Sequence, residues 1–170
     1  YACGDARTNY LPAAHWISGE LGRRLFARLR SDADLSMTFG PDLKILSSLS
    51  VAPGATSVEW ERLILSVQHL PRLSYERQHR ILLPILKQIL GELENEGLQG
   101  VASNFARNTL VLNGAGEFAI GGPVGDNGLS GKKLVIDHYG PGVPIGGGAL
   151  AGKDPHKVDK CGARAAAWER

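Results

Sequence analysis

Two segments of this chain have apolar residues at helical spacing, and they enclose two runs with strand-like alternation. In each helical segment the apolar residues recur three or four positions apart, which places them on one face: Ala14, Ile17, Leu21, Leu25 and Leu29, then Ile81, Ile85, Ile89 and Leu93. We therefore predict amphipathic helices over residues 12–30 and from Ser74, a plausible N-cap, onward. Pro84 lies inside the second helix and is expected to kink or split it.

The runs "KILSSLSVA" and "VEWERLILSVQ" are predicted to be strands joined by the turn sequence "PGATS". In the second run Leu63, Leu65 and Val67 share one side, so one face of the sheet is expected to be buried. Shorter strands are predicted in "NTLVLN", "EFAI" and "KKLVIDHY", and a helix is predicted to start in "KVDKCGARAAAWER". The polar sequence "SDADLSMTFGPD" is predicted to be a loop.

These elements favour an α+β fold in which helices pack on an antiparallel sheet in two layers, followed by a glycine-rich ligand-binding segment. The length of 170 residues fits one domain with part of a second. We divide the chain into an α+β domain over residues 1–120 and a glycine-rich segment over residues 121–170 that begins an incomplete second domain.

Composition excludes several classes of protein. Hydrophobic residues make up 43% of the chain and charged residues 21%, as in ordinary globular proteins. A net charge of +2 argues against a nucleic-acid partner. No apolar run approaches the length of a membrane span, and Cys3 and Cys161 have no metal-type spacing, so we expect free thiols and a cytoplasmic protein. The chain opens on Tyr1, from which we expect a piece of something longer.

Half of the glycines, 11 of 22, fall between Gly121 and Gly152. Such backbone can approach a ligand closely and turn its N–H groups toward an anion. Lysines and aspartates lie among and after these glycines: Asp126, Lys132, Lys133, Asp137, Lys153, Asp154, Lys157, Asp159 and Lys160. The segment contains neither a P-loop nor a dinucleotide fingerprint. From the residues alone, two interpretations stay open: a site for a phosphate-rich ligand, or a flexible surface loop with solvated charges.

The sequences "GGPVGDNGLSGKKLVIDHYG" and "GGGALAGKDPHKVDK" closely resemble the signature of the S-adenosylmethionine synthetase family, also called methionine adenosyltransferase. That family has GGPxGDxGLTGRKxxxDTYG and GGGAFSGKDPxKVDRS at the same separation. Upstream, "FGPDLK" is similar to the family's RPDxK, "LILSVQH" to its VVxSxQH, and "LVLNGAGEFAIGG" to its xxINPTGRFVIGG. The resemblance spans the whole chain, strongly after Gly116 and loosely before it.

The resemblance implies an adenosyl transferase that joins methionine to ATP and releases pyrophosphate and phosphate, with Mg²⁺ and K⁺ as cofactors. It also implies an oligomer, because the family's active sites lie between subunits. The family's N-terminal third holds a GHPDK histidine and further metal ligands, which this sequence does not contain. We therefore expect activity only with a companion chain or partner that supplies that segment.

Carried over motif by motif, the family's ATP contacts fall on Asp42 and Lys44 in "FGPDLK", and on Asp126, which in the family touches both ATP and methionine. Lys132 and Lys133 match its phosphate-binding Arg-Lys pair, although two lysines at the start of a strand are also commonly solvated.

In the second motif Ala149 and Lys153 match further ATP contacts, Lys157 a lysine near methionine and the phosphates, and Asp159 a metal-associated aspartate. Among these residues we expect Asp126, Lys133 and Lys153 to be catalytic.

Several positions depart from the family pattern. Glu117 replaces the arginine of GRF and would repel a phosphate there. Lys132 in place of arginine forfeits bidentate phosphate geometry. These departures keep a second hypothesis open, a non-catalytic relative that binds nucleotide or polyphosphate or regulates a synthetase. His15 and His69 fall at family histidines and are expected to be structural, whereas His79 and His138 are expected at the surface or in packing.

Overall fold

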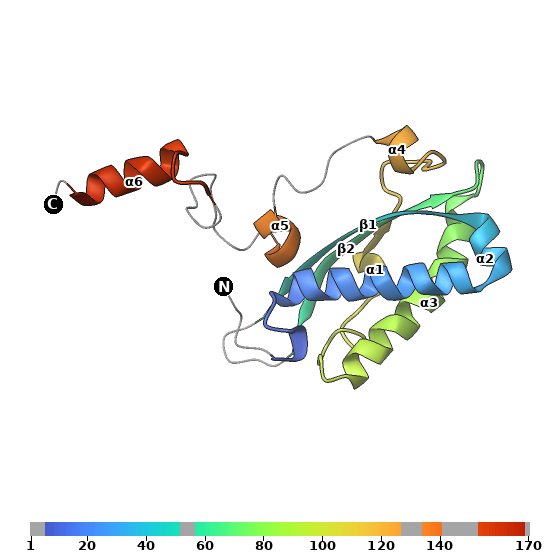
Figure 1. Cartoon of the computed structure of the whole chain (residues 1–170). Helices are drawn as coiled ribbons and strands as arrows, with labels where there is room; N and C mark the ends of the chain where they lie inside the picture. The colour runs from blue at the N-terminus through green and yellow to red at the C-terminus, as the bar shows by residue number, and fades with distance from the viewer. Residues whose placement is uncertain (1–5, 52–56, 127–133, 141–152, 169–170) are drawn as a thin grey trace. The chain divides into compact units, whose positions relative to one another are not determined.

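A computed structural model describes residues 6–51, 57–126, 134–140 and 153–168 (Figure 1). The chain divides into two units, Tyr1–Lys132 and Lys133–Arg170. The helices and strands of the first unit are η1 (Ala6–Thr8), α1 (Ala13–Ser31), α2 (Ala33–Thr38), β1 (Phe39–Ser50), β2 (Glu59–His69), α3 (Tyr75–Asn95), η2 (Arg107–Thr109), β3 (Leu110–Leu112) and α4 (Gly122–Gly125). The second unit contains α5 (Leu134–Tyr139) and α6 (Val158–Trp168).

The sheet has the strand order β1-β2-β3. β1 and β2 are antiparallel, as predicted for the hairpin, and pair Lys44 with Ser66 and Leu46 with Ile64. β3 pairs with β2 in parallel, with Leu63 opposite Leu110. The predicted α+β class is confirmed, and the sheet is antiparallel except for this last short strand.

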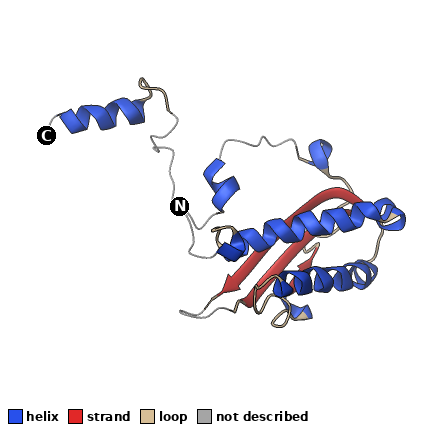
Figure 2. Ribbon diagram, turned by 60° about the horizontal axis from the view of Figure 1, so that its bottom comes forward, coloured by secondary structure: helices blue, strands red, loops and turns tan. Residues whose placement is uncertain are grey.

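Both long helices pack on one face of the sheet (Figure 2). The predicted stripes of α1 and β2 supply this contact. In α3 the buried face lies one residue further along than predicted, because Leu82 and Leu86 are fully buried whereas Ile81 and Ile85 are only partly buried beside the core. The buried residues of these elements are Ile17, Leu21, Leu25, Leu29, Leu82, Leu86, Ile89, Leu90, Leu93, Leu63, Leu65 and Val67. Ser18 Oγ and Ser47 Oγ lie 2.6 Å apart, which fixes α1 against the odd-numbered residues of β1. The even-numbered residues of β1 therefore point to the other face.

Proline inside α3 does not split the helix. α3 is continuous over Tyr75–Asn95 and includes Pro84, so of the expected kink or split the split does not occur. Pro84 is exposed, and the leucines on the opposite side of the helix are buried. The hydrogen bond that Pro84 removes therefore lies on the solvent side of the helix. Core packing on the opposite side keeps the helix continuous despite this loss. Ser74 caps it as predicted, accepting from the Arg77 N–H.

Three local predictions differ from the structure. Within the predicted loop, Asp32 accepts from the Leu35 N–H at 2.9 Å and caps α2, and β1 begins at Phe39. Residues 117–120, predicted as a strand, are irregular, although Phe118 O accepts from the His69 N–H at 3.0 Å. The predicted strand "KKLVIDHY" is instead the helix α5 over its last six residues. The predicted C-terminal helix is confirmed as α6.

An ion-pair network joins the solvent sides of α1 and α3. Arg24 donates to both carboxylate oxygens of Glu96, at 2.8 and 2.7 Å, and to Glu20 at 3.2 Å. Arg28 reaches Glu92 on the same helix pair. Hydrogen bonding from Arg23 and Arg24 lowers the pKa of Glu20, and hydrogen bonding from Arg24 lowers that of Glu96. These ion pairs link, on the solvent side, two helices that also pack together through the leucine core.

Within the described residues, no helix combines the length and the apolarity that a membrane span requires. Cys161 is a free, exposed cysteine, and Cys3 lies outside the described residues. The domain boundary expected at residue 120 stays a prediction.

Leu86→Ala is expected to lower the free energy of unfolding by about 2–5 kcal/mol, because Leu86 is fully buried between α3 and the sheet. Leu70→Ala is the matched control, since Leu70 is 53% exposed and its loss is expected to cost less than about 0.5 kcal/mol. Urea unfolding followed by circular dichroism measures both. Equal losses for the two variants would contradict the assignment of the core.

The lowered pKa values of Glu20 and Glu96 predict a loss of stability in acid. Each carboxylate stabilises the fold above its ordinary pKa of 4.5, and this contribution is lost as pH falls through the lowered folded-state value. Both pairs are partly exposed, so about 1 kcal/mol or less is expected from each. Urea unfolding between pH 3 and pH 7 is expected to show a shallower pH dependence for Glu96→Gln than for the unaltered chain, and identical slopes would refute the assignment.

Candidate functional site

Gln68, the residue before the last of β2, joins the beginning of β1 to the loop after β3. Its Oε1 accepts from the Asp42 N–H at 3.3 Å, and its Nε2 donates to Ala119 O at 3.2 Å. Asp42 lies in an irregular stretch of the β1–β2 pairing, between Phe39 and Leu43. Its Oδ2 accepts from the Gly122 N–H at 2.9 Å. Asp42, predicted as an ATP contact, is thus bonded to the start of the glycine-rich segment.

Two glycines let these backbones approach so closely. A Cβ on Gly121 would lie 2.7 Å from Asp42 Cβ and 2.7 Å from Gln68 Oε1. A Cβ on Gly40 would lie 2.3 Å from Gln68 Cδ. A side chain at Gly40 would therefore displace the Gln68 side chain from its hydrogen bonds, and one at Gly121 would also overlap Asp42.

The loop after β3 is attached to β2 by His69, which is 3% exposed. His69 Nε2 lies 3.2 Å from the Phe118 N and 3.3 Å from Gln78 Nε2, both of which donate to it, whereas Nδ1 lies 2.8 Å from Leu70 O. This pattern assigns the proton to Nδ1 and leaves Nε2 as the acceptor. The structural role predicted for His69 is therefore to fix the backbone at Phe118.

Asn113 completes this buried polar group. It has a positive φ of 43°, and its Oδ1 accepts from the Val67 N–H at 2.8 Å. Its Nδ2 donates to Gln78 Oε1 at 2.6 Å. Because Asn113 ends β3 and satisfies the polar atoms of β2, it sets the direction in which residues 114–122 leave the sheet.

A cavity of about 180 Å³ lies beside this loop, lined by Lys44, Ser66, Asn113, Ala115, Gly116, Glu117 and Phe118. Lys44 Nζ lies 5.6 Å from the centre of the Phe118 ring, within cation–π distance. A cation beside an aromatic face suits a planar ligand that carries a negative group. Lys44 and Ser66 face each other across the open side of the sheet, away from α1.

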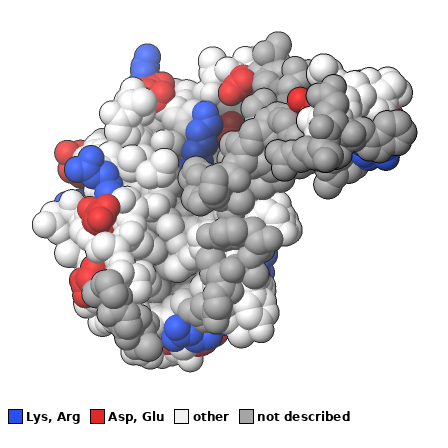
Figure 3. Space-filling view, turned by 90° about the vertical axis from the view of Figure 1, so that its left-hand side faces the viewer, with Lys and Arg blue, Asp and Glu red and all other residues white. Residues whose placement is uncertain are grey.

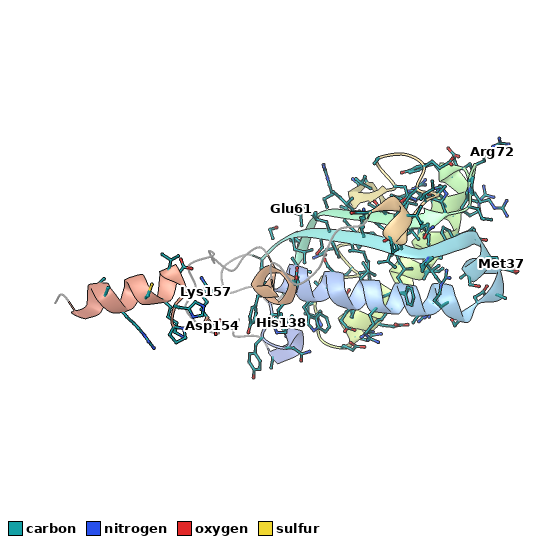
Figure 4. The ribbon with its side chains drawn as sticks, turned by 45° about the horizontal axis from the view of Figure 1, so that its top comes forward. Met37, Glu61, Arg72, His138, Asp154 and Lys157 are labelled. Carbon is teal, nitrogen blue, oxygen red and sulfur yellow. The ribbon has the colours of Figure 1, made fainter. Side chains whose placement is uncertain are left out.

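Glu117 introduces a carboxylate at the rim of this cavity. Its side chain is exposed, and its Oε2 accepts from the Arg72 N–H at 3.2 Å. The Arg72 side chain itself points out from the end of the sheet (Figure 4). The cavity therefore contains one cation, Lys44, and one anion, where the family resemblance implied two cations.

The α4 turn carries Asp126 at its C-terminal end. Asp126 is exposed, and its N–H donates to Gly122 O at 2.9 Å. α4 is thus continuous with the segment that Asp42 holds. In the first unit Asp42 and Lys44 contact the loop at residues 113–126, at Gly122 and Phe118 respectively, and Asp126 is the last residue of that loop. Lys132, Lys133 and Ala149 lie outside the described residues.

The second unit holds the remaining predicted site residues near the start of α6 (Figure 4). Lys153 Nζ and Asp159 Oδ2 form an ion pair at 2.5 Å, and the Lys153 ammonium lowers the pKa of the Asp159 carboxyl. Lys160 Nζ donates to Lys153 O at 2.6 Å, and Lys157 is exposed on the same turn. The predicted ATP contact and the predicted metal ligand are therefore bonded to each other.

Among the described residues, no group of three or more His, Cys, Asp or Glu side chains could hold a metal ion. Asp159 would provide a single carboxylate. On the side drawn in Figure 3, basic and acidic side chains of the described residues are mixed and do not gather into large areas of one sign.

Sequence reasoning missed Gln68, Asn113 and Phe118 as organisers of the site. Gln68 carried a weak signal, because it is a polar residue at the end of an apolar strand. Asn113 carried another, since asparagine before a glycine favours a left-handed turn. No local signal marks Phe118, whose role depends on which strand its loop returns to.

The comparisons with known proteins concern the sequence and the fold. Residues 120–169 match the family model of the S-adenosylmethionine synthetase C-terminal domain. The chain is 34% identical to the S-adenosylmethionine synthase of Corynebacterium kroppenstedtii, over 94% of this chain and 38% of the relative. It is 34% identical to that of Wolinella succinogenes, over 99% of this chain and 40% of the relative.

The fold is similar to that of a solved S-adenosylmethionine synthetase from Campylobacter jejuni. The TM-score is 0.58 at 24% identity, covering 95% of this chain and 40% of that one. Fold and sequence together define an α+β protein built like part of a synthetase. The chain belongs to the S-adenosylmethionine synthetase family, and it spans about two fifths of the length of the relatives it matches.

Gly121→Ala is expected to separate Asp42 from the glycine-rich segment, because the added methyl group would overlap Asp42 and Gln68. Amide hydrogen exchange is expected to be faster at Gly122, whose N–H loses its acceptor. Gly19→Ala is the control: no atom lies within 4 Å of the added Cβ, and α1 is expected to gain about 1 kcal/mol. Unchanged exchange at Gly122 in Gly121→Ala would contradict the close approach.

Proposed function

We propose that this chain supplies part of the ATP and methionine site of a methionine adenosyltransferase. The hydrogen bond from the Gly122 N–H to Asp42 Oδ2 carries the proposal. It joins two segments 80 residues apart in the sequence, and both resemble ATP-binding motifs of the family. Such a contact is what a shared ligand site requires and what two unrelated surface loops would not need.

In the proposed reaction the methionine sulfur attacks the ribose C5′ of ATP. The new S–C bond forms as the C–O bond to the triphosphate breaks, and the triphosphate is then hydrolysed to pyrophosphate and phosphate. Negative charge develops on the leaving group, so fixed cations stabilise the transition state. Lys132, Lys133, Lys153 and Lys157 would provide this charge, while Asp126 would contact ATP and methionine. Lys44 and Phe118 would line the nucleotide side of the site.

Mg²⁺ and K⁺ are the proposed cofactors. Mg²⁺ is commonly held by one or two carboxylates together with substrate phosphates, so Asp159 fits as a single protein ligand beside a triphosphate. Its ion pair with Lys153 supports a related role for the lysine, because an arriving phosphate can take the place of the carboxylate at the ammonium group. A bound Mg²⁺ would neutralise the leaving triphosphate.

The proposal includes a protein partner, either a second copy of this chain or a companion chain that supplies the family's N-terminal segment. The sheet face away from α1 supports such a partner, since Leu46 there is 57% exposed and lies opposite Ile64. Neither nucleic acid nor membrane is expected as a partner, and the proposed activity is cytoplasmic.

Glu117 favours a second candidate, a non-catalytic relative that binds nucleotide or regulates a true synthetase. A carboxylate at the cavity rim opposes a phosphate where the family has arginine. The two candidates are separated by assaying S-adenosylmethionine and pyrophosphate with ATP, methionine, Mg²⁺ and K⁺. The chain is tested alone and with a GHPDK-containing companion, and the absence of product in both would exclude the catalytic candidate.

Under both candidates, Lys153→Ala is expected to weaken MgATP binding about tenfold or more, because a charge-assisted hydrogen bond to phosphate is lost. Isothermal titration calorimetry measures the dissociation constant. Lys87→Ala is the control, since Lys87 is an exposed lysine of α3 outside the predicted site. Equal MgATP affinity in both variants would remove Lys153 from the site. No MgATP binding by the unaltered chain, either alone or with the GHPDK-containing companion, would overturn the ATP-binding role in both candidates.

A further inference from the structure

A second cavity, of about 360 Å³, lies between α3 and η2 and is lined by Glu76, His79, Arg80, Leu83 and Arg107. It shares no residue with the cavity at Lys44. Its volume is at the lower end of the range of about 300–1,000 Å³ that is usual for small-molecule sites. Nothing in the proposed transferase reaction uses these residues.

The lining from α3 forms one face of that helix. Glu76, His79, Arg80 and Leu83 follow each other at steps of three, one and three, which places them on adjacent turns of the same side. Arg107 approaches this face from η2, just before β3. Two separate elements thus bring two guanidinium groups to one hollow.

The charges in this cavity have no partners of their own among the described residues. Neither Arg80 nor Arg107 forms an ion pair there, and Glu76 forms none, although Arg80 lies one helical turn away. With a neutral histidine, two arginines and one glutamate leave a single net positive charge. A ligand with one carboxylate and one ammonium group offers a partner to both kinds of charge, whereas a triphosphate carries only anionic groups and would face the glutamate.

The burial of His79 is a second observation that indicates a ligand in this cavity. Its side chain is 5% exposed, its Nε2 lies 3.0 Å from Tyr75 Oη, and its buried Nδ1 has no hydrogen-bond partner among the described residues. An unpartnered buried polar atom destabilises a fold, and one common reason for it is a water, ion or ligand that completes the group. Burial and the nearby charge of Arg107 lower the pKa of His79, consistent with a neutral ring.

We propose that this cavity binds a free α-amino acid with an apolar side chain. The two guanidinium groups of Arg80 and Arg107 hold the carboxylate, for which planar bidentate donors are well suited. The Glu76 carboxylate pairs with the ligand's ammonium group, and Leu83 contacts its side chain. A carboxylate oxygen of the ligand accepts from His79 Nδ1 in the tautomer that carries its proton there. Each lining residue then has a partner.

The first test measures the melting temperature of the whole chain with 10 mM L-leucine, L-valine or inorganic phosphate at constant ionic strength. L-leucine and L-valine are expected to raise it, and the ¹⁵N signal of His79 Nδ1 is expected to shift in the same titration. No rise in melting temperature and no shift at Nδ1 would overturn the proposal. Methionine is left out because the proposed transferase site binds it, and Lys153→Ala is expected to leave L-leucine binding unchanged.

Variants of the lining residues identify the ligand chemistry. Arg107→Gln is expected to weaken L-leucine binding at least tenfold, whereas Arg77→Gln, an exposed arginine of α3 outside the cavity, leaves it unchanged. Glu76→Gln is expected to weaken L-leucine binding and to strengthen phosphate binding, because the ammonium partner and the repulsive charge are lost together. Phosphate binding that equals L-leucine binding in the unaltered chain would identify a general anion site and overturn the amino-acid proposal.

Discussion

The burial of one face of the β1–β2 hairpin under α1 and α3 is the constraint on which the rest of this structure depends. Side chains alternate along a strand, so the leucines that enter the core also determine which residues leave it. With Leu43 and Ile45 packed toward the helices, Lys44 emerges on the open face opposite Ser66. A shift of one residue in register would bury the lysine and empty the cavity beside it.

Three buried polar side chains then hold the loop after β3 against the sheet. His69, Gln78 and Asn113 come from β2, α3 and the end of β3, and all three are less than a tenth exposed. Their hydrogen bonds satisfy one another and the neighbouring backbone, which is the condition under which buried polar atoms stabilise a fold. The loop that carries Glu117 and Phe118 is therefore attached to the sheet through its backbone at Phe118, in addition to the contacts of its own side chains.

The sequence was sufficient for the elements whose signal is periodic. The stripes of α1 and β2 follow directly from their apolar residues, because burial on one face repeats at the period of the element. In α3 the continuous apolar run from Ile81 to Leu83 left the centre of the stripe one residue away from Leu82 and Leu86, which are the fully buried positions. Short helices could not be predicted in this way, because they end before a buried position can repeat. The six residues of α2 and of α5 span less than two turns, so an N-cap such as Asp32 is a stronger signal than any stripe. The glycine motifs identified the family, but no pattern within one segment could reveal that Asp42 contacts Gly122.

The parallel pairing of β3 with β2 has a topological consequence for the site. A chain that returns by way of α3 and pairs in parallel brings the carboxyl ends of both strands to the same edge of the sheet. Gln68 and His69 end one strand at this edge, and Asn113 ends the other. Had the chain returned as a tight hairpin, the loop carrying the glycine motif would emerge at the opposite end of the molecule's first unit. The crossover through α3 thus places two distant motifs at one edge of the sheet, where β3 pairs in parallel with β2.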